Sequence, residues 1–159
     1  MSYQAVILTV SDSCAAGTRT DTSGPAIRAM LENAGFAVQA MQTVPDEEGQ
    51  ISAAIVHACD ILQADLVVTT GGTGLSPCDV TPEATLAVLD REIRAIPVAM
   101  WVEGLKSTPR AMLSRAAAGI RGHTLVLNVP GSEKAARENL GAVVATLDHA
   151  LRMLAGGGH

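Results

Sequence analysis

A glycine-rich stretch with a nearby carboxylate is the part of this sequence best suited to chemistry. It reads TTGGTGLSPCDVTPEAT over residues 69–85, with the loop Gly71–Gly74 followed by Asp79. Successive glycines let backbone N–H groups converge on an anion. A carboxylate beside that anion would repel it, unless a cation such as Mg²⁺ binds both the carboxylate and a phosphate. The stretch therefore predicts a phosphate site bridged by Mg²⁺.

Simpler explanations exist for each part of this stretch. The glycines also suit a tight strand-to-helix turn that needs positive φ, and Asp79 suits a local Asx turn. Thr81 is predicted to cap the following helix with Pro82 at its first helical position, which would leave Asp79 free of that duty. Neither the GxGxxG pattern of dinucleotide-binding folds nor the P-loop pattern GxxxxGK[ST] is present.

Three more loops of small, hydroxylic or acidic residues follow strand-like runs. They contain Ser11–Ser13, Asp46 and Pro130–Ser132. Loops at the carboxyl ends of parallel strands converge, so these residues are expected beside the glycine loop. Other roles remain open, because Asp12 suits a turn and Asp46 suits a helix cap.

Two features of the same loops favour anion binding. Ser132 is predicted to cap the last helix, whose N-terminal amides would then face an anion. Arg110 and Arg115 are the arginines we expect to contribute positive charge, because a guanidinium matches phosphate geometry.

The elements that must position these loops alternate between strand and helix. Residues 5–10, 65–70 and 124–129 are continuous apolar runs typical of buried parallel strands, whereas residues 37–44 alternate and are expected near a sheet edge. Helical stripes of apolar residues lie between and after them, at Ile27, Met30, Leu31 and Ala34, at Ile51, Ala54, Ile55, Ala58, Cys59 and Leu62, and at Leu140, Val143, Val144, Leu147, Leu151 and Leu154.

This order predicts an α/β fold with a mostly parallel central sheet and helices on both faces. We expect one domain over residues 1–155 and a flexible tail over 156–159. Residues 92–120 read as two helical pieces broken near Pro109, and the pattern gives them no place on the sheet.

Composition disfavours several classes of partner. The 159 residues carry a net charge of −5 and only 2% aromatic residues, so neither nucleic acid nor an acidic membrane is an expected partner. No apolar stretch approaches the length of a membrane span. Three cysteines, Cys14, Cys59 and Cys78, lack CxxC spacing, which predicts neither a disulfide framework nor a zinc site and favours a reducing cytoplasm.

Taken together, these motifs resemble a known family. The 69–85 stretch, with LTVSDS, VPDEEGQI and AMLSRAAAGIRGHTLVLNVPGS, closely resembles the MogA/MoaB family of molybdenum-cofactor biosynthesis over about residues 6–154. The resemblance implies a three-layer α/β/α domain, usually a homotrimer. It also implies a molybdopterin adenylyltransferase, which transfers AMP from ATP to the terminal phosphate of molybdopterin, releases pyrophosphate and requires Mg²⁺.

The resemblance also implies roles for individual residues. Asp46 and Asp79 would be the catalytic and metal-binding acids, although one of them could instead bind the pterin. The residues implied for nucleotide and pterin binding are Ser11, Asp12, Ser13, Gly71, Gly72, Thr73, Gly74, Glu83, Ser114, Arg115, Pro130, Gly131 and Ser132.

One departure from the family pattern suggests an alternative function. Members commonly have arginine directly before the aspartate of the D-V-T-P motif, where this chain has Cys78. A second, milder departure is Ser132–Glu133 after Pro130–Gly131. The alternative function is a relative of the same fold that binds molybdopterin, or serves as a scaffold, without turnover.

Overall fold

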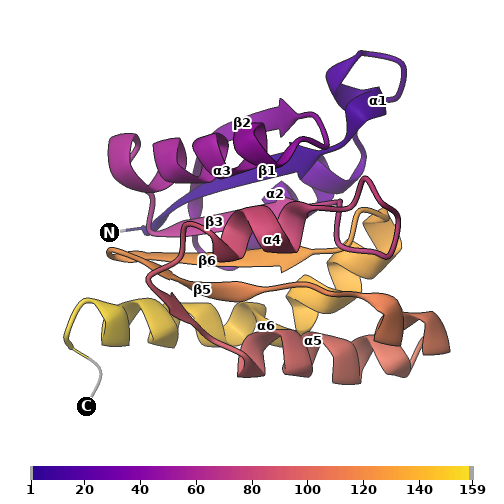
Figure 1. Ribbon diagram of the computed structural model, residues 1–159. Helices are drawn as coiled ribbons and strands as arrows, with labels where there is room; N and C mark the ends of the chain where they lie inside the picture. The colour runs from indigo at the N-terminus through magenta and orange to yellow at the C-terminus, as the bar shows by residue number, and fades with distance from the viewer. Residues whose placement is uncertain (1, 158–159) are drawn as a thin grey trace.

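A six-stranded sheet forms the centre of the structure, a computed structural model that describes residues 2–157 (Figure 1). The strands run in the order β2-β1-β3-β6-β5-β4. The first four in that order are mutually parallel, and β5 and β4 continue the sheet in antiparallel fashion. Their bounds are β1 Gln4–Val10, β2 Ala37–Val44, β3 Leu66–Thr70, β4 Arg91–Glu92, β5 Ala118–Arg121 and β6 Thr124–Val129. The predicted α/β class and mostly parallel sheet are confirmed.

Helices cover both faces of this sheet. The apolar residues of α2, α5 and α6 pack with one face, and those of α3 and α4 pack with the other. The helices are α1 Asp12–Ala15, α2 Ser23–Asn33, α3 Glu48–Val56, α4 Thr81–Leu86, α5 Ala95–Leu105 and α6 Glu133–Leu154. A π-helical turn, His57–Ile61, prolongs α3, and a 3₁₀ turn, Pro109–Leu113, follows α5.

Strand burial agrees with the hydrophobic pattern. All residues of β3 and β6 are buried, as expected for strands covered by helices on both sides. β2 forms one edge of the sheet and exposes several side chains, so its predicted edge position is confirmed. The central strands β1, β3 and β6 end at the same edge of the sheet, so the loops that follow them lie close together (Figure 1).

The stretch 92–120 was only partly predictable. Helix α5 does end shortly before Pro109, which begins the 3₁₀ turn, but the alanine-rich end of the stretch is not helical. It forms β5, which pairs with β6 and with the short β4. A side chain at Gly119 would collide with the backbone oxygen of Arg91, so close strand pairing depends on that glycine. Tertiary pairing here overrides the low strand propensity of alanine.

The chain after α6 stays close to the helix end for two residues. The amide of Gly156 donates to the carbonyl of Met153 at 2.9 Å, and that of Gly157 donates to the carbonyl of Arg152 at 3.0 Å. Residues 158–159 of the predicted tail lie outside the described part of the chain. No helix within residues 2–157 is both long and apolar enough to cross a bilayer.

Candidate active site

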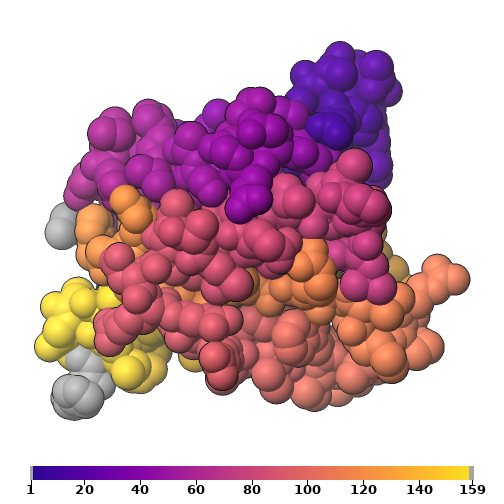
Figure 2. Space-filling model, in the orientation of Figure 1, coloured from indigo at the N-terminus to yellow at the C-terminus, as the bar shows by residue number. Residues whose placement is uncertain are grey.

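A cavity of about 640 Å³ lies at the carboxyl ends of β1, β3 and β6. The segment that follows β1, the loop after β3 and the segment around the 3₁₀ turn gather at this end of the molecule, on the right of Figure 2. Among the residues predicted for the site, the cavity wall contains Ser11, Asp46, Gly71, Gly72, Thr73, Gly74, Asp79, Ser114, Pro130, Gly131 and Ser132. Asp12, Ser13, Glu83 and Arg115 do not line it.

The glycine loop is both a tight turn and a source of free donors. Gly71 and Gly72 have φ of +102° and +69°, and a side chain at Gly71 would collide with the backbone oxygen of Val10. The turn explanation is therefore confirmed. Among residues 2–157, the amides of Gly72, Thr73 and Gly74 nevertheless donate to no protein acceptor. These three amides can bind an anion.

Asp46 is held in place by a reciprocal backbone contact. Its Oδ2 accepts from the amide of Asp12 at 3.0 Å, while Oδ1 of Asp12 accepts from the amide of Asp46 at 2.8 Å. The helix cap that Asp46 was considered for is supplied by Glu47, whose carboxylate accepts from the amides of Gly49 and Gln50. The Asp46 carboxylate is therefore free for another role.

The surroundings of Asp46 disfavour its charged form. Burial raises the pKa of its carboxyl group, the hydrogen bond from Asp12 lowers that pKa, and the negative charges of Asp12 and Asp79 raise it further. A cation between Asp46 and Asp79 would relieve this repulsion. The two carboxylates thus form a local concentration of negative charge in one cavity.

Asp79 forms the turn that was its alternative explanation, and it still lines the cavity. Its Oδ2 accepts from the amide of Ser76 at 3.0 Å, and its own amide donates to the carbonyl of Ser76 at 2.9 Å. The predicted cap at Thr81 is wrong, because Val80 is the N-cap of α4 and no side chain caps the helix. Thr81 is instead the first residue of α4, and its amide donates to the carbonyl of Gly72 at 3.1 Å.

Arg115 clamps the glycine loop from outside the cavity. Its guanidinium donates to the carbonyls of Gly74 and Asp79 at 2.8 and 2.7 Å, and to Glu83 Oε2 at 2.6 Å. All three guanidinium nitrogens are thereby engaged. The structure thus brings Arg115 and Glu83 to the loop that forms the site rather than to the cavity itself.

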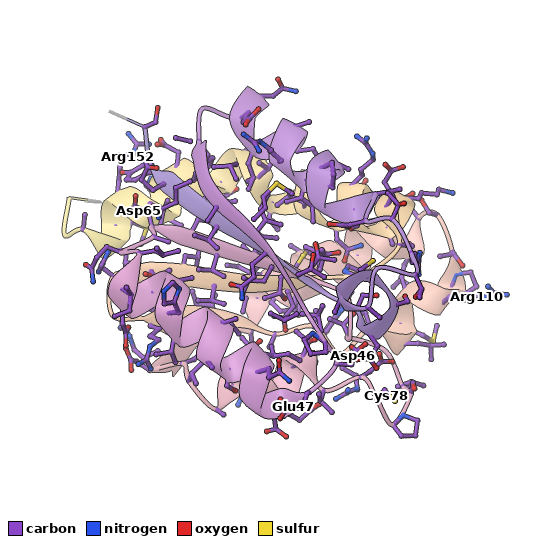
Figure 3. The ribbon with its side chains drawn as sticks, turned by 90° about the horizontal axis from the view of Figure 1, so that it is seen from above. Asp46, Glu47, Asp65, Cys78, Arg110 and Arg152 are labelled. Atoms are coloured by element: carbon purple, nitrogen blue, oxygen red, sulfur yellow. The ribbon has the colours of Figure 1, made fainter. Side chains whose placement is uncertain are left out.

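Two other arginines line the cavity wall. Arg19 and Arg110 form no ion pair within residues 2–157. Figure 3 shows Arg110 at the same end of the molecule as Asp46 and Cys78, with Asp65 and Arg152 at the opposite end. Arg110 was predicted as a cationic contributor from its sequence position, whereas Arg19 was not.

The serines of the first and last loops serve as helix caps. Ser11 accepts from the amide of Cys14 at 3.2 Å, and its hydroxyl contacts that of Ser13, also at 3.2 Å. Ser132 accepts from the amide of Ala135 at 3.2 Å, so its predicted cap on α6 is confirmed. These caps place the amino ends of α1 and α6 beside the cavity.

One wall of the cavity was missed in the sequence. Residues 19–23, which precede and begin α2, line it together with Asn139 of α6. Asp21 is fixed there because it accepts from Thr9 Oγ1 at 2.7 Å and from the amide of Gly24 at 3.0 Å. The run TDTSG is rich in helix-capping residue types, which is the signal that could have identified it.

The donor set suits Mg²⁺ bound jointly with substrate phosphates. Among the described residues, no group of three histidine, cysteine, aspartate or glutamate side chains could hold a metal ion alone. Mg²⁺ often binds one or two carboxylates and completes its shell with phosphate oxygens and water. Asp46 and Asp79 provide two carboxylates in one cavity, beside three free amides.

The sequence matches a family described as probable molybdopterin binding domain, over residues 6–149. It is 37% identical over 154 residues to a molybdopterin adenylyltransferase of Helicobacter pylori, covering 94% of this chain and 86% of that protein. It is 40% identical to the Drosophila melanogaster molybdenum cofactor synthesis protein cinnamon, covering 93% of this chain. The chain spans only 25% of the length of cinnamon, 22% of a Dictyostelium discoideum gephyrin and 49% of a Chlorobaculum tepidum bifunctional protein.

Solved structures match over nearly the whole chain. MoaB of Thermus thermophilus, described as a molybdopterin biosynthesis enzyme, superposes with a TM-score of 0.92 at 48% identity, covering 97% of both chains. The molybdopterin biosynthesis Mog protein of Mycobacterium ulcerans superposes with a TM-score of 0.90 at 38% identity, covering 96% of this chain and 99% of that one.

Proposed function

The chain belongs to the MogA/MoaB family of molybdenum-cofactor biosynthesis, and we propose that it is a molybdopterin adenylyltransferase. In this reaction the terminal phosphate of molybdopterin attacks the α-phosphate of ATP. AMP is transferred to that phosphate, and pyrophosphate leaves. The named activity of the Helicobacter pylori relative, which this chain matches over most of both lengths, supports the proposal.

One observation carries the proposal: two carboxylates and three uncommitted amides share a single cavity. The carboxylates are Asp46 and Asp79, and the amides belong to Gly72, Thr73 and Gly74. Carboxylates alone would repel a phosphate, whereas backbone amides alone could bind a phosphate without any carboxylate nearby. Their combination suits a nucleotide that arrives together with a divalent cation.

The chemistry needs alignment more than proton transfer. The attacking phosphate is already an anion, so no strong general base is required. Asp46 and Asp79 would hold Mg²⁺, which offsets the repulsion between the two polyanionic substrates. The free amides of the glycine loop and the amino end of α6 behind Ser132 would bind phosphate oxygens. Arg19 and Arg110 add positive charge at the cavity wall.

Cys78 favours the second candidate, a binding protein without turnover. It is exposed in the loop beside Asp79, at the position where family members commonly carry arginine. The loss of that cation would weaken phosphate binding. Because Arg19 and Arg110 also line the cavity and are not ion-paired within residues 2–157, positive charge is still present, and we retain the enzyme as the proposal.

The test is pyrophosphate release with molybdopterin, Mg²⁺ and ATP. We expect turnover by the parent protein and a loss of roughly 100-fold or more in Asp79→Asn, because electrostatic stabilisation of the reacting phosphates would fall. Asp148→Asn is the matched control, since Asp148 lies on α6 and only pairs with Arg152 at the surface. Circular dichroism checks that both variants are folded.

The outcomes separate the two candidates. A parent protein that binds molybdopterin but releases no pyrophosphate would support the binding protein. Turnover by Asp79→Asn at the parent rate would refute the metal-holding role of Asp79 while leaving the reaction itself intact.

A further inference from the structure

Thr81 is fully buried, yet its hydroxyl serves no structural purpose among the described residues. Its relative exposure is 0%, and Oγ1 finds no hydrogen-bond partner within residues 2–157. It does not cap α4, whose N-cap is Val80. Burying a hydroxyl without a partner is unfavourable, so a valine would be the more stable residue unless the hydroxyl has another use.

The Thr81 hydroxyl and the Asp46 carboxylate both lie beside Gly72. A side-chain carbon placed on Gly72 would collide with Thr81 Oγ1 and would lie 3.3 Å from Asp46 Oδ1. The other carboxylate oxygen, Oδ2, already accepts from the Asp12 amide at 3.0 Å, whereas Oδ1 accepts from no residue in 2–157. An uncommitted donor and an uncommitted acceptor therefore lie beside the same face of Gly72.

We propose that Thr81 is a positioning residue for Asp46 in the ligand-bound site. When the carboxylate holds the Mg²⁺ that is bound to the phosphates of ATP, the Thr81 hydroxyl donates a hydrogen bond directly to Oδ1. This inference rests on the proposed function, because it requires Asp46 to hold the cation. Each carboxylate oxygen has two lone pairs, so Oδ1 can accept from Thr81 and still bind the cation.

This arrangement would fix the orientation of the carboxylate. The Asp12 amide holds Oδ2 and the Thr81 hydroxyl holds Oδ1, so the remaining lone pairs are directed toward the cavity. Hydrogen bonds of this kind to a metal-binding carboxylate raise metal affinity, and their loss weakens it. Thr81 itself would touch neither substrate.

The experiment compares Thr81→Val with Thr81→Ser. Each protein is titrated calorimetrically with ATP in the presence of Mg²⁺ and again in EDTA, and its melting temperature is measured. We expect Thr81→Val to bind ATP with Mg²⁺ about 3- to 10-fold more weakly, with no difference in EDTA. Its melting temperature should equal or exceed that of the parent, and Thr81→Ser should restore the parent affinity.

Thr85→Val is the matched control, since Thr85 is a buried threonine one turn along the same helix. Its hydroxyl already has partners, because it donates to the Thr81 carbonyl at 2.7 Å and accepts from Asn128 Nδ2 at 3.0 Å. We expect this variant to melt at a lower temperature and to bind ATP with Mg²⁺ as the parent does.

Three results would count against the inference. Parent affinity in Thr81→Val would show that the hydroxyl does not position Asp46. A Thr81→Val protein that melts several degrees below the parent, as Thr85→Val should, would show that the hydroxyl stabilises the free protein instead. If Asp46→Asn binds ATP with Mg²⁺ as tightly as the parent, the metal role of Asp46 in the proposed function fails first, and the role of Thr81 fails with it.

Discussion

At the residue scale, single atoms decide whether the glycine loop can form. Gly71 has φ of +102° and lies against the carbonyl oxygen of Val10, at the end of β1. Its amide donates to the carbonyl of Val129 at 3.1 Å, so this one residue joins the ends of β1, β3 and β6. A glycine here is needed for close approach as well as for backbone conformation.

Replacing Gly71 should therefore cost more than backbone strain alone. We expect Gly71→Ala to lower the free energy of unfolding by at least ~3 kcal/mol, because a methyl group would meet the Val10 carbonyl. Gly122→Ala is the control, since Gly122 also has positive φ but has open space around it, and it should cost only about 1 kcal/mol. Urea denaturation measures both, and equal losses would contradict the prediction.

The sequence predicted those site residues whose position follows from the strand that precedes them in the chain. Asp46 and Asp79 follow strand-like runs, so the parallel sheet brings them together without further information. Arg19 and Asp21 reach the cavity only because the segment before α2 folds back over the end of β1, where Thr9 donates to Asp21. The capping residues of this segment indicate a helix start, but no local pattern indicates that the segment packs over β1.

At the element scale, the chain segment before β5 supports the loop after β3. The backbone amide of Arg115 donates to the carbonyl of Thr73 at 2.8 Å, and its guanidinium donates to the carbonyls of Gly74 and Asp79. Two segments about forty residues apart in sequence therefore form one rigid wall. A lysine has one nitrogen and cannot reproduce these three side-chain contacts, including that to Glu83.

We expect Arg115→Lys to loosen the glycine loop and to raise the KM for ATP about 10-fold through lost alignment. The control is Arg121→Lys, because Arg121 likewise binds a carboxylate and a carbonyl, those of Asp60 and Val88, but makes no hydrogen bond to the glycine loop. Hydrogen exchange should increase in residues 72–80 only in the Arg115 variant. Equal KM values in both variants would refute the specific role of Arg115.

The prediction of elements failed where pairing rather than periodicity decides the structure. Residues 116–120 read as helix because alanine favours it, yet Ala118 and Gly119 fit between β4 and β6 because they are small. The long apolar runs of β3 and β6 were predicted within one residue of their ends. A continuous apolar run predicts a buried strand from local sequence alone, whereas short antiparallel strands such as β4 and β5 depend on their pairing partners.

At the scale of the whole molecule, the sheet separates two cores and leaves the cavity at its end. Several large apolar side chains of the outer helical layer remain exposed: Val98, Val102, Leu105, Met112 and Leu113. Exposed apolar surface favours association with another chain. The homotrimer expected from the family resemblance stays a prediction.

We expect sedimentation equilibrium to give a mass about three times the 16.3 kDa of one chain, because association would remove apolar surface from water. Dilution through the micromolar range tests how tightly the copies associate. A single species of 16.3 kDa at all concentrations would contradict the trimer.

The three cysteines differ sharply in their surroundings, with a practical benefit for spectroscopy. Burial raises the pKa of the Cys59 thiol to about 11, so that sulfur resists alkylation, whereas Cys78 is exposed beside Asp79. Cys14 contributes only its backbone amide to the cap at Ser11, so serine can replace it. A maleimide dye would then attach at one place, and its emission would follow nucleotide entry in real time.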